Sequence, residues 1–119
     1  EDNLPPTLPD AKNVKVDVNK VMKYALNPNH PTGKHKARVF ESALGYNQSN
    51  GNQLIQQIQS RIPNAKALLN GEADQHGQRF TVEMNLLGPN GKHATIITGW
   101  ILKPGEITPV MTTLYVKKG

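Results

Sequence analysis

Residues 79–86 read RFTVEMNL, and polar and apolar side chains alternate at every position of this stretch. An alternation with a period of two is typical of a half-buried β-strand. The side chains expected to face the core are Phe80, Val82, Met84 and Leu86. Residues 93–102 follow a turn with the hairpin dipeptide Asn90-Gly91, and because they are apolar on both faces they predict a central strand. With further strands at 65–72 and 109–118, this half of the chain predicts a meander of three or four antiparallel strands.

The half of the chain before Pro63 carries helical periodicity instead. Apolar residues recur at helical spacing over about 18–26, where Asp17 is a good N-cap, and again over about 33–44 and 51–61. Pro63 ends the last of these segments. The fold class expected from this order is α+β, with about three N-terminal helices packed on a three- to four-stranded antiparallel sheet.

The length of 119 residues is enough for one hydrophobic core. Residues 1–15 are acidic and rich in proline, so we expect them to be a linker from a longer polypeptide, followed by a single domain over 16–119. The start of the chain does not resemble a signal peptide, and no run of about 18 apolar residues predicts a membrane-spanning helix.

The composition excludes some chemistries and favours one class of partner. There are no cysteines, which excludes disulfides, thiolate zinc sites and cysteine nucleophiles. Fourteen Lys and Arg against nine Asp and Glu give a formal net charge of +5. A small basic domain commonly meets a polyanion, because contacts to phosphates supply most of the sequence-independent affinity for nucleic acids. A domain that is merely soluble and basic is the simpler alternative.

Residues 26–40, LNPNHPTGKHKARVF, join the first two predicted helices and contain two of the four histidines. His30 lies between two prolines, and a residue before proline is kept out of the α region, so its ring is expected on a stiff turn. Cleavage of RNA without a metal needs a base for the 2′-hydroxyl, an acid for the leaving 5′-oxygen, and cations for the charged transition state. An imidazole can fill either proton-transfer role. His30, with His35 as a second candidate, and the cations Lys36 and Arg38 match this requirement.

Metal chemistry is the weaker prediction. His30 and His35 match no zinc-binding spacing, and no carboxylate is close in sequence before Glu41. No cofactor is expected. His35 could also be a solvated residue at the start of a helix, and His76, in an exposed turn, is expected to take no part.

The predicted sheet supplies a second group of candidates. If the strand at 79–86 turns its apolar side chains to the core, Arg79 and Glu83 line the opposite face. On the last strand, one face carries Met111, Thr113, Tyr115 and Lys117, and the other, expected to be core, carries Val110, Thr112, Leu114 and Val116. The open face could bind a phosphate and move a proton, although an ordinary polar sheet surface explains the same pattern. Trp100 is expected in the core, with Thr98 on the same side of its strand.

Residues 26–45 resemble the signature LNPxHPxGxxKAxVF…LG of an uncharacterised family, through LNPNHP, Gly33, KARVF and Leu44-Gly45. Later marks of the family are the strings GQRF, NG and TGW and Pro109, so the resemblance covers roughly residues 9–115. Members often form the C-terminal tips of very large secreted bacterial proteins, including the effectors of contact-dependent growth inhibition. The resemblance implies that the chain is the toxin piece and that a neighbouring gene encodes its immunity protein.

The resemblance also implies an activity. Helices followed by an antiparallel sheet are similar to the barnase, EndoU, colicin D and RelE group of ribonucleases, several of which cut tRNA near the anticodon. Active residues vary within this group, so the resemblance implies only the location of the site in this chain. That location is the cleft on the sheet face opposite the main helix. His30, Lys36 and Arg79 match signature positions of the family, whereas members often have an acidic residue in place of His35.

The resulting hypothesis is a metal-independent ribonuclease toxin acting on tRNA, secreted as the tip of a large cell-surface effector and delivered to the target-cell cytoplasm. The candidate catalytic residues are His30, His35, Lys36, Arg79, Thr98 and Thr113. The candidate RNA-binding residues are Lys34, Arg38, Lys92, Tyr115 and Lys117. The expected partners are an acidic immunity protein and tRNA, and a requirement for a host factor stays open. The alternatives are a basic module that binds nucleic acid or protein without cutting it, and a toxin acting on DNA or another substrate.

Overall fold

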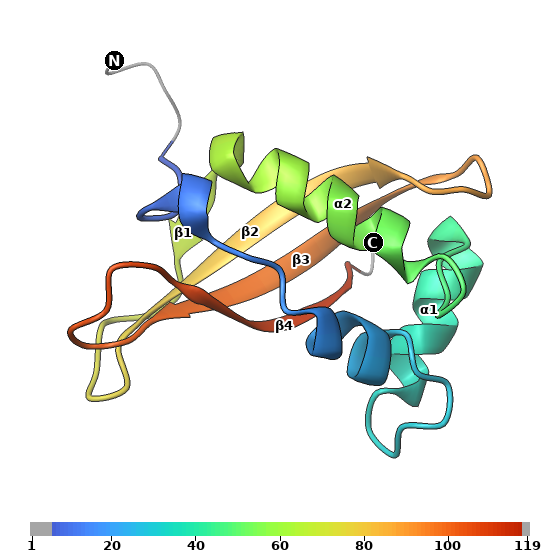
Figure 1. The fold of residues 1–119 in the computed structure, drawn as a ribbon, viewed down its shortest axis with the longest axis horizontal. Helices are drawn as coiled ribbons and strands as arrows, with labels where there is room; N and C mark the ends of the chain where they lie inside the picture. Colours follow the sequence, from blue (N-terminus) through green and yellow to red (C-terminus); the bar gives the residue numbers. More distant parts are fainter. Residues whose placement is uncertain (1–5, 118–119) are drawn as a thin grey trace.

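The computed structural model describes residues 6–117 and has an α+β fold (Figure 1). Four antiparallel strands form one sheet in the order β1-β2-β3-β4. The strands are β1 (Ala67–Leu69), β2 (Gln78–Leu87), β3 (His93–Leu102) and β4 (Val110–Val116). Each strand pairs with the next one along the chain, so the predicted meander is confirmed. The first strand is shorter than the predicted stretch 65–72.

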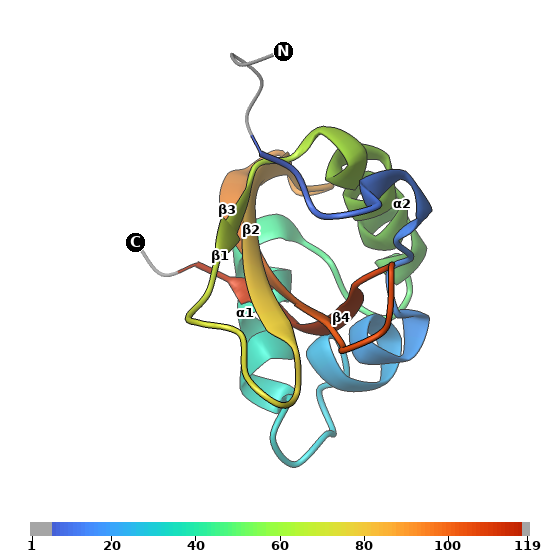
Figure 2. The ribbon, with the colours of Figure 1, turned by 90° about the vertical axis from the view of Figure 1, so that its left-hand side faces the viewer.

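Two α-helices, α1 (Lys34–Leu44) and α2 (Gly51–Arg61), lie close to their predicted positions. The segment expected as a helix over about 18–26 contains a π-helix, η2 (Lys20–Ala25). Two short 3₁₀ turns, η1 (Ala11–Asn13) and η3 (Ile62–Asn64), complete the elements. In Figures 1 and 2, α2 and η2 lie on the same side of the sheet, and α1 packs at one end of it against β4, β3 and η2. No helix within residues 6–117 is long and apolar enough to cross a membrane.

The helices form where the sequence places apolar residues at helical spacing. In α1, Ala37, Phe40 and Leu44 are buried and face the core. Gly45 ends the helix with φ at 85°, a conformation that glycine adopts without strain, and its N–H donates to the carbonyls of Phe40 and Glu41. This ending fixes the direction of α1, and therefore fixes where its first turn meets the sheet.

The core contains Trp100, as predicted, at 1% exposure. Residues before position 16 also contribute to it, because Leu8, Ala11 and Val14 are buried. The N–H of Ala67 in β1 donates to the carbonyl of Pro6 at 2.8 Å. The domain boundary predicted at residue 15 therefore does not coincide with the edge of the folded core. The linker prediction for residues 1–5 lies outside the described residues.

A β-bulge changes the predicted face assignment of β4. Gly99 pairs with Thr113 and Trp100 pairs with Met111, so Thr112 is an extra residue on β4. Met111 is consequently buried in the core and Val110 is 46% exposed, the reverse of the prediction. Beyond the bulge the prediction is correct, because the residues from Thr113 onward keep the expected parity. The bulge lies beside Thr113, the strand residue closest to the candidate site.

Candidate functional site

Lys36, in the first turn of α1, is held by three groups from two other elements. Its Nζ donates a hydrogen bond to Thr113 Oγ1 at 2.9 Å. The same nitrogen lies 4.7 Å from the ring centroid of Tyr24 and 5.5 Å from that of Tyr115. Aromatic faces attract an ammonium through their quadrupole. Because an ammonium has three N–H donors, two remain for a ligand after the bond to Thr113.

His30 is fixed on its turn by backbone donors. Its Nδ1 accepts the N–H of Gly33 at 2.9 Å and that of Thr32 at 3.1 Å. The ring also packs edge-on against Tyr24, with the centroids 4.8 Å apart. Because Nδ1 is the acceptor in both bonds, the hydrogen bonding assigns the ring proton to Nε2. The stiff turn expected from the two prolines therefore presents Nε2–H as a hydrogen-bond donor.

The π-helix η2 brings Tyr24 between His30 and Lys36. Its wider winding is closed by the Leu26 N–H, which donates to the carbonyl of Val21, five residues back, at 2.8 Å. The turn that follows packs tightly against η2, because a Cβ added at Gly33 would lie 2.3 Å from the carbonyl oxygen of Tyr24. Gly33 is therefore needed for close approach, and a larger residue would separate His30 from Tyr24.

A pocket of about 430 Å³ opens beside these groups. We call it the His30 pocket, and its lining residues are Asp17, Asn19, Lys20, Lys23, Tyr24, His30, Thr112 and Thr113. Lys36 reaches its edge through the contacts with Tyr24 and Thr113. Asp17 is its carboxylate, and Asp17 Oδ1 accepts the N–H groups of Asn19 at 3.0 Å and Lys20 at 3.2 Å. The pocket thus combines lysines, an imidazole, hydroxyls and one carboxylate, which can bind an anion and exchange a proton.

Of the eight pocket residues, only His30 and Thr113 were among the sequence-based candidates, and the basic and aromatic residues Lys20, Lys23 and Tyr24 of η2 were not. Lys20, Lys23 and Tyr24 lie at positions i, i+3 and i+4 of η2 and all three line the pocket, whereas Val21 and Ala25 are buried in the core. This basic and aromatic spacing in the sequence was the signal that could have predicted these residues as part of a nucleic-acid site. Asp17 was recognised only as an N-cap, a role that the structure confirms while also placing it in the pocket.

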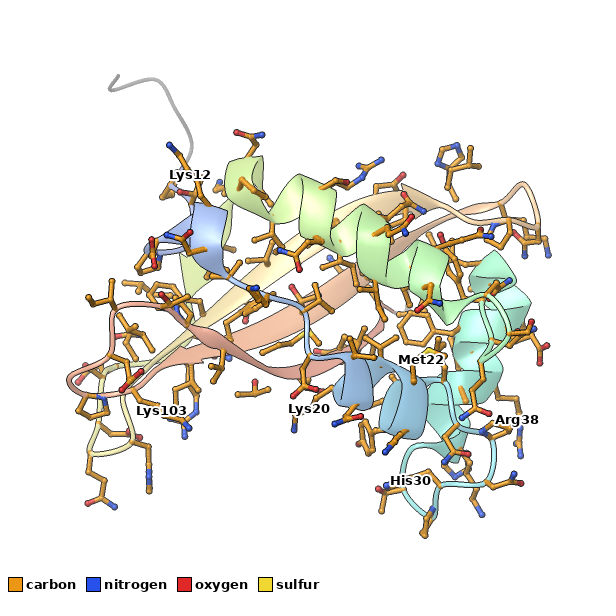
Figure 3. All side chains as sticks on the ribbon, in the orientation of Figure 1. Lys12, Lys20, Met22, His30, Arg38 and Lys103 are labelled. Carbon is orange, nitrogen blue, oxygen red and sulfur yellow. The ribbon has the colours of Figure 1, made fainter. Side chains whose placement is uncertain are left out.

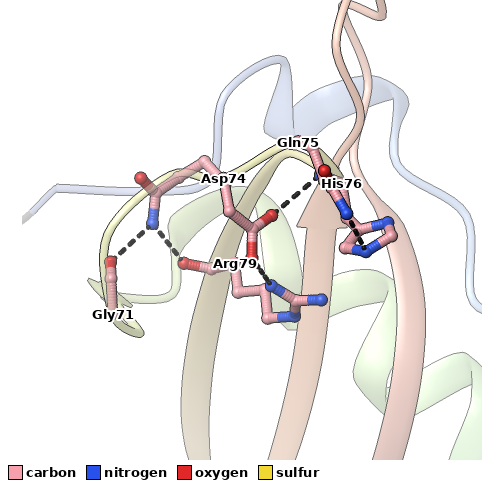
Figure 4. Close-up of polar contacts among 6 residues, drawn as sticks. Gly71, Asp74, Gln75, His76 and Arg79 are labelled. Carbon is pink, nitrogen blue, oxygen red and sulfur yellow. Dashed lines mark hydrogen bonds and ion pairs between the residues drawn. The ribbon is translucent and has the colours of Figure 1, made fainter.

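Arg79 is not brought together with His30 and Lys36. Its Nη1 forms an ion pair with Asp74 Oδ2 at 3.1 Å, as Figure 4 shows. The pKa of Asp74 is lowered, chiefly by a hydrogen bond from the His76 N–H and then by the bond from Arg79. Arg79 pairs with Ile101 and Thr113 pairs with Gly99, so the two residues are offset by about 7 Å along the strands and by about 10 Å across β3. Arg79 shares the open sheet face with Thr113 but stabilises the 74–77 turn.

Figure 3 shows where the two groups of residues lie in the molecule. His30 lies at one end of the molecule, and Lys103, which follows β3, lies at the other. The start of β2 belongs to the Lys103 end, because Gln78 pairs with Leu102. Lys92, in the turn between β2 and β3, is also distant from the pocket, since its turn packs on the C-terminal end of α1 through the Asn90 N–H and the Leu44 carbonyl.

The other predicted residues on α1 and β4 line two further hollows. His35 is exposed and lines a groove with Tyr115 and Lys117. Lys117 pairs with Glu83 at 3.1 Å. Lys34 and Arg38 are exposed and line a separate hollow on α1. Among residues 6–117, no three His, Asp or Glu side chains gather in a way that could hold a metal ion.

Thr98 is in the core and not in the site. Its side chain is fully buried, its hydroxyl donates to the Val82 carbonyl at 3.0 Å, and it accepts from Trp100 Nε1 at 2.9 Å. Thr98 and Trp100 lie on one side of β3, as predicted, but Thr98 has no surface on which to contact a substrate. Its role is to satisfy the indole N–H inside the core.

Replacing Thr98 with Val should therefore lower the free energy of unfolding by about 1–3 kcal/mol, because the buried indole N–H loses its acceptor. Urea unfolding followed by Trp100 fluorescence measures this change. The matched control is Thr95→Val, on the open face of the same strand, which should change the free energy of unfolding by less than about 0.5 kcal/mol. Equal losses in the two variants would contradict this account of Thr98.

A small α+β domain with a basic pocket between η2, α1 and β4 is the class of protein that this fold and site define. The chain belongs to the family described as "Domain of unknown function (DUF6883)", whose model matches residues 7–118. That match includes residues 7–15, in agreement with their place in the core. No curated protein sequence matches the chain.

One similar solved structure is the "Contact-dependent growth inhibition toxin - immunity protein complex from Klebsiella pneumoniae 342". The TM-score is 0.67 at 18% sequence identity, and the match covers 90% of this chain and 96% of that chain. At this identity the likeness establishes a shared fold. His30, Gly33 and Lys36, which belong to the signature in residues 26–45, lie around Tyr24 in the structure.

Proposed function

We propose that this domain is the toxin of a contact-dependent growth inhibition system and that it cleaves RNA, with tRNA as its target. The observation that carries the proposal is the convergence of Lys36, Thr113, Tyr24 and His30 beside one basic pocket. The fold shared with a toxin–immunity complex and the net charge of +5 support it. A polyanion fits the charge, and a phosphodiester fits the size and polarity of the pocket.

The proposed reaction is attack of the 2′-hydroxyl on the adjacent phosphate, with departure of the 5′-oxygen. Lys36 would neutralise a non-bridging phosphate oxygen with its two remaining N–H donors, and Lys20 and Lys23 would hold the flanking phosphates. Thr113 keeps the ammonium of Lys36 in place. Stabilisation of this kind, by fixed donors around the developing charge, is worth about 10²–10³ in rate for each donor.

The role of His30 differs from the proton transfer expected from the sequence. Proton transfer through Nε2 requires Nδ1 to carry a hydrogen, which would break both bonds from Thr32 and Gly33. Donation of a hydrogen bond from Nε2–H requires no change. We assign His30 as a neutral donor to the phosphate and Asp17, the carboxylate of the pocket, as the base that takes the proton of the 2′-hydroxyl. The departing 5′-oxygen takes its proton from solvent water, which reaches the open pocket.

In this proposal the domain is carried at the tip of a large cell-surface effector and delivered into the target cell. An acidic immunity protein, encoded by the neighbouring gene, would cover the basic pocket. Electrostatic complementarity between the two would speed their association. An immunity role for this chain is the second candidate, because the similar structure contains both kinds of protein. Its positive charge favours the toxin.

Induction of the domain in a cell that lacks the neighbouring gene separates the two roles. The proposal expects growth arrest with fragmented tRNA on a denaturing gel of total RNA, and intact RNA when the neighbouring gene product is expressed as well. Growth arrest with intact RNA would contradict ribonuclease activity and point to DNA or another substrate. Harmless accumulation would point to an immunity or binding role.

A further inference from the structure

A second concave site lies next to Lys36 and shares no lining residue with the His30 pocket. We call it the Tyr115 groove, and its lining residues are His35, Lys36, Val39, Tyr115, Val116 and Lys117. Its volume is about 440 Å³. Unlike the His30 pocket, the groove has mostly apolar walls. Val39 on α1 is 36% exposed and Tyr115 on β4 is 37% exposed, which are high values for large apolar surfaces.

The groove and the pocket are adjacent because Lys36, which lines the groove, contacts two residues that line the pocket. Its side chain lines the groove, and its Nζ contacts Thr113 and Tyr24, which line the pocket. A ligand atom bound to Lys36 Nζ would therefore lie at the boundary between a polar space and an apolar one. A nucleotide has the same division, with a charged phosphate on one side and a flat, largely apolar base on the other.

The charges around the groove favour an anionic strand. His35, Lys36 and Lys117 lie at its rim, and no carboxylate lines it among the described residues. Lys117 forms an ion pair with Glu83, which offsets its charge, so Lys36 supplies the main positive charge at the groove. Tyr115 offers the ring face on which a base could stack, and stacking on an aromatic side chain tolerates every base because each has a π-face.

We propose that the Tyr115 groove binds the base of a nucleotide flanking the phosphate held by Lys36, and thereby selects single-stranded RNA. This inference rests on the proposed function and adds a substrate class to it. A base can enter the groove only when it is unstacked, as in a loop of an RNA or at an unpaired end. Val39, on α1, lines the groove together with Tyr115 and limits the space for the base.

An abasic scan tests this proposal. A fluorescent RNA hexamer with 2′-O-methyl groups, which block attack by the 2′-oxygen, is titrated with the protein, and each position in turn lacks its base. We expect one abasic position to weaken binding to the wild type by roughly 5- to 150-fold, the range for one stacked base. The Tyr115→Leu variant should bind the full hexamer more weakly than the wild type. In this variant, removal of the base at that position should cause no further loss of binding.

Two matched pairs of variants separate the groove from general effects. Val110→Ala changes an exposed apolar residue on the same strand outside the groove, and it should keep the wild-type scan. Val39→Glu places a charge in the groove wall, whereas Ser42→Glu places the same charge one turn later on α1 at an exposed position. Val39→Glu should weaken binding of the hexamer much more than Ser42→Glu.

The outcomes distinguish this inference from the proposed function. A wild type that cleaves RNA but shows equal losses at all abasic positions overturns the base site and leaves the ribonuclease intact. A position-specific loss that survives in Tyr115→Leu places the base elsewhere and also overturns the inference. A flat scan together with loss of protection by the immunity protein in Tyr115→Leu would assign the groove to that protein. A wild type that neither binds the hexamer nor cleaves RNA overturns the proposed function itself.

Discussion

Replacement of Lys36 with Met should reduce the rate of RNA cleavage by about 10²–10³-fold, because the transition state loses its best-placed cation. Met keeps the apolar part of the lysine side chain and can still pack beside Tyr24 and Tyr115, but it lacks the ammonium that lies over the two rings and bonds Thr113. The loss should appear in kcat and not only in KM, since the charge on the phosphate oxygens develops during the reaction. Cleavage of a labelled RNA under single-turnover conditions measures it.

The matched control for this variant is Lys34→Met, on the same helix. Lys34 is exposed and lines neither the His30 pocket nor the Tyr115 groove. It should lose only a few-fold in rate, through weaker attraction of the RNA, and high salt should erase the difference. If the two variants lose the same activity, Lys36 contributes general charge, and the proposed site is wrong.

Replacement of His30 should separate hydrogen-bond donation from proton transfer. His30→Ala should lose about 10²–10³-fold in rate, the cost of one donor to the developing charge. His30→Gln can still present an N–H toward the pocket and should recover roughly tenfold of that loss. A proton-transfer residue cannot be replaced in this way, because an amide does not exchange protons at neutral pH. Single-turnover rates of the two variants give the comparison.

The same assignment predicts the behaviour of Asp17. Asp17→Asn keeps an oxygen to accept the N–H groups that cap η2, so the fold should be preserved, but it removes the base and should cost about 10²–10⁴ in rate. If His30→Gln is as inactive as His30→Ala while Asp17→Asn is active, His30 is the proton-transfer residue and its turn must open during the reaction.

The fold was largely predictable because it follows from short-range patterns. Alternation at 79–86 and the two-sided apolar run at 93–102 depend on neighbouring residues only, and the structure has strands in both places. The bulge at Thr112 was not predictable, because it arises from a mismatch in pairing between β3 and β4 that neither strand reveals alone. The π-helix, one residue per turn wider than the expected helix, was also not predicted, because the apolar spacing of residues 18–26 does not distinguish the two kinds of helix.

The candidate site was predictable where local geometry decides it and not where tertiary contacts do. His30 and Lys36 follow from the turn and the helix start in one stretch of sequence. Thr113, 77 residues away from Lys36 in the chain, was placed on the correct face by parity. Arg79 was grouped with them on the same argument, but parity gives the face of a sheet and not the distance along it, and Asp74 was an unrecognised partner.

The most direct test of the central claim is the cleavage of a labelled tRNA mixture by the purified domain in the presence of EDTA. The account predicts fragments that end in a 2′,3′-cyclic phosphate with the wild type and intact tRNA with Lys36→Met. Cleavage of equal extent by the two proteins, or intact tRNA with the wild type, would contradict it.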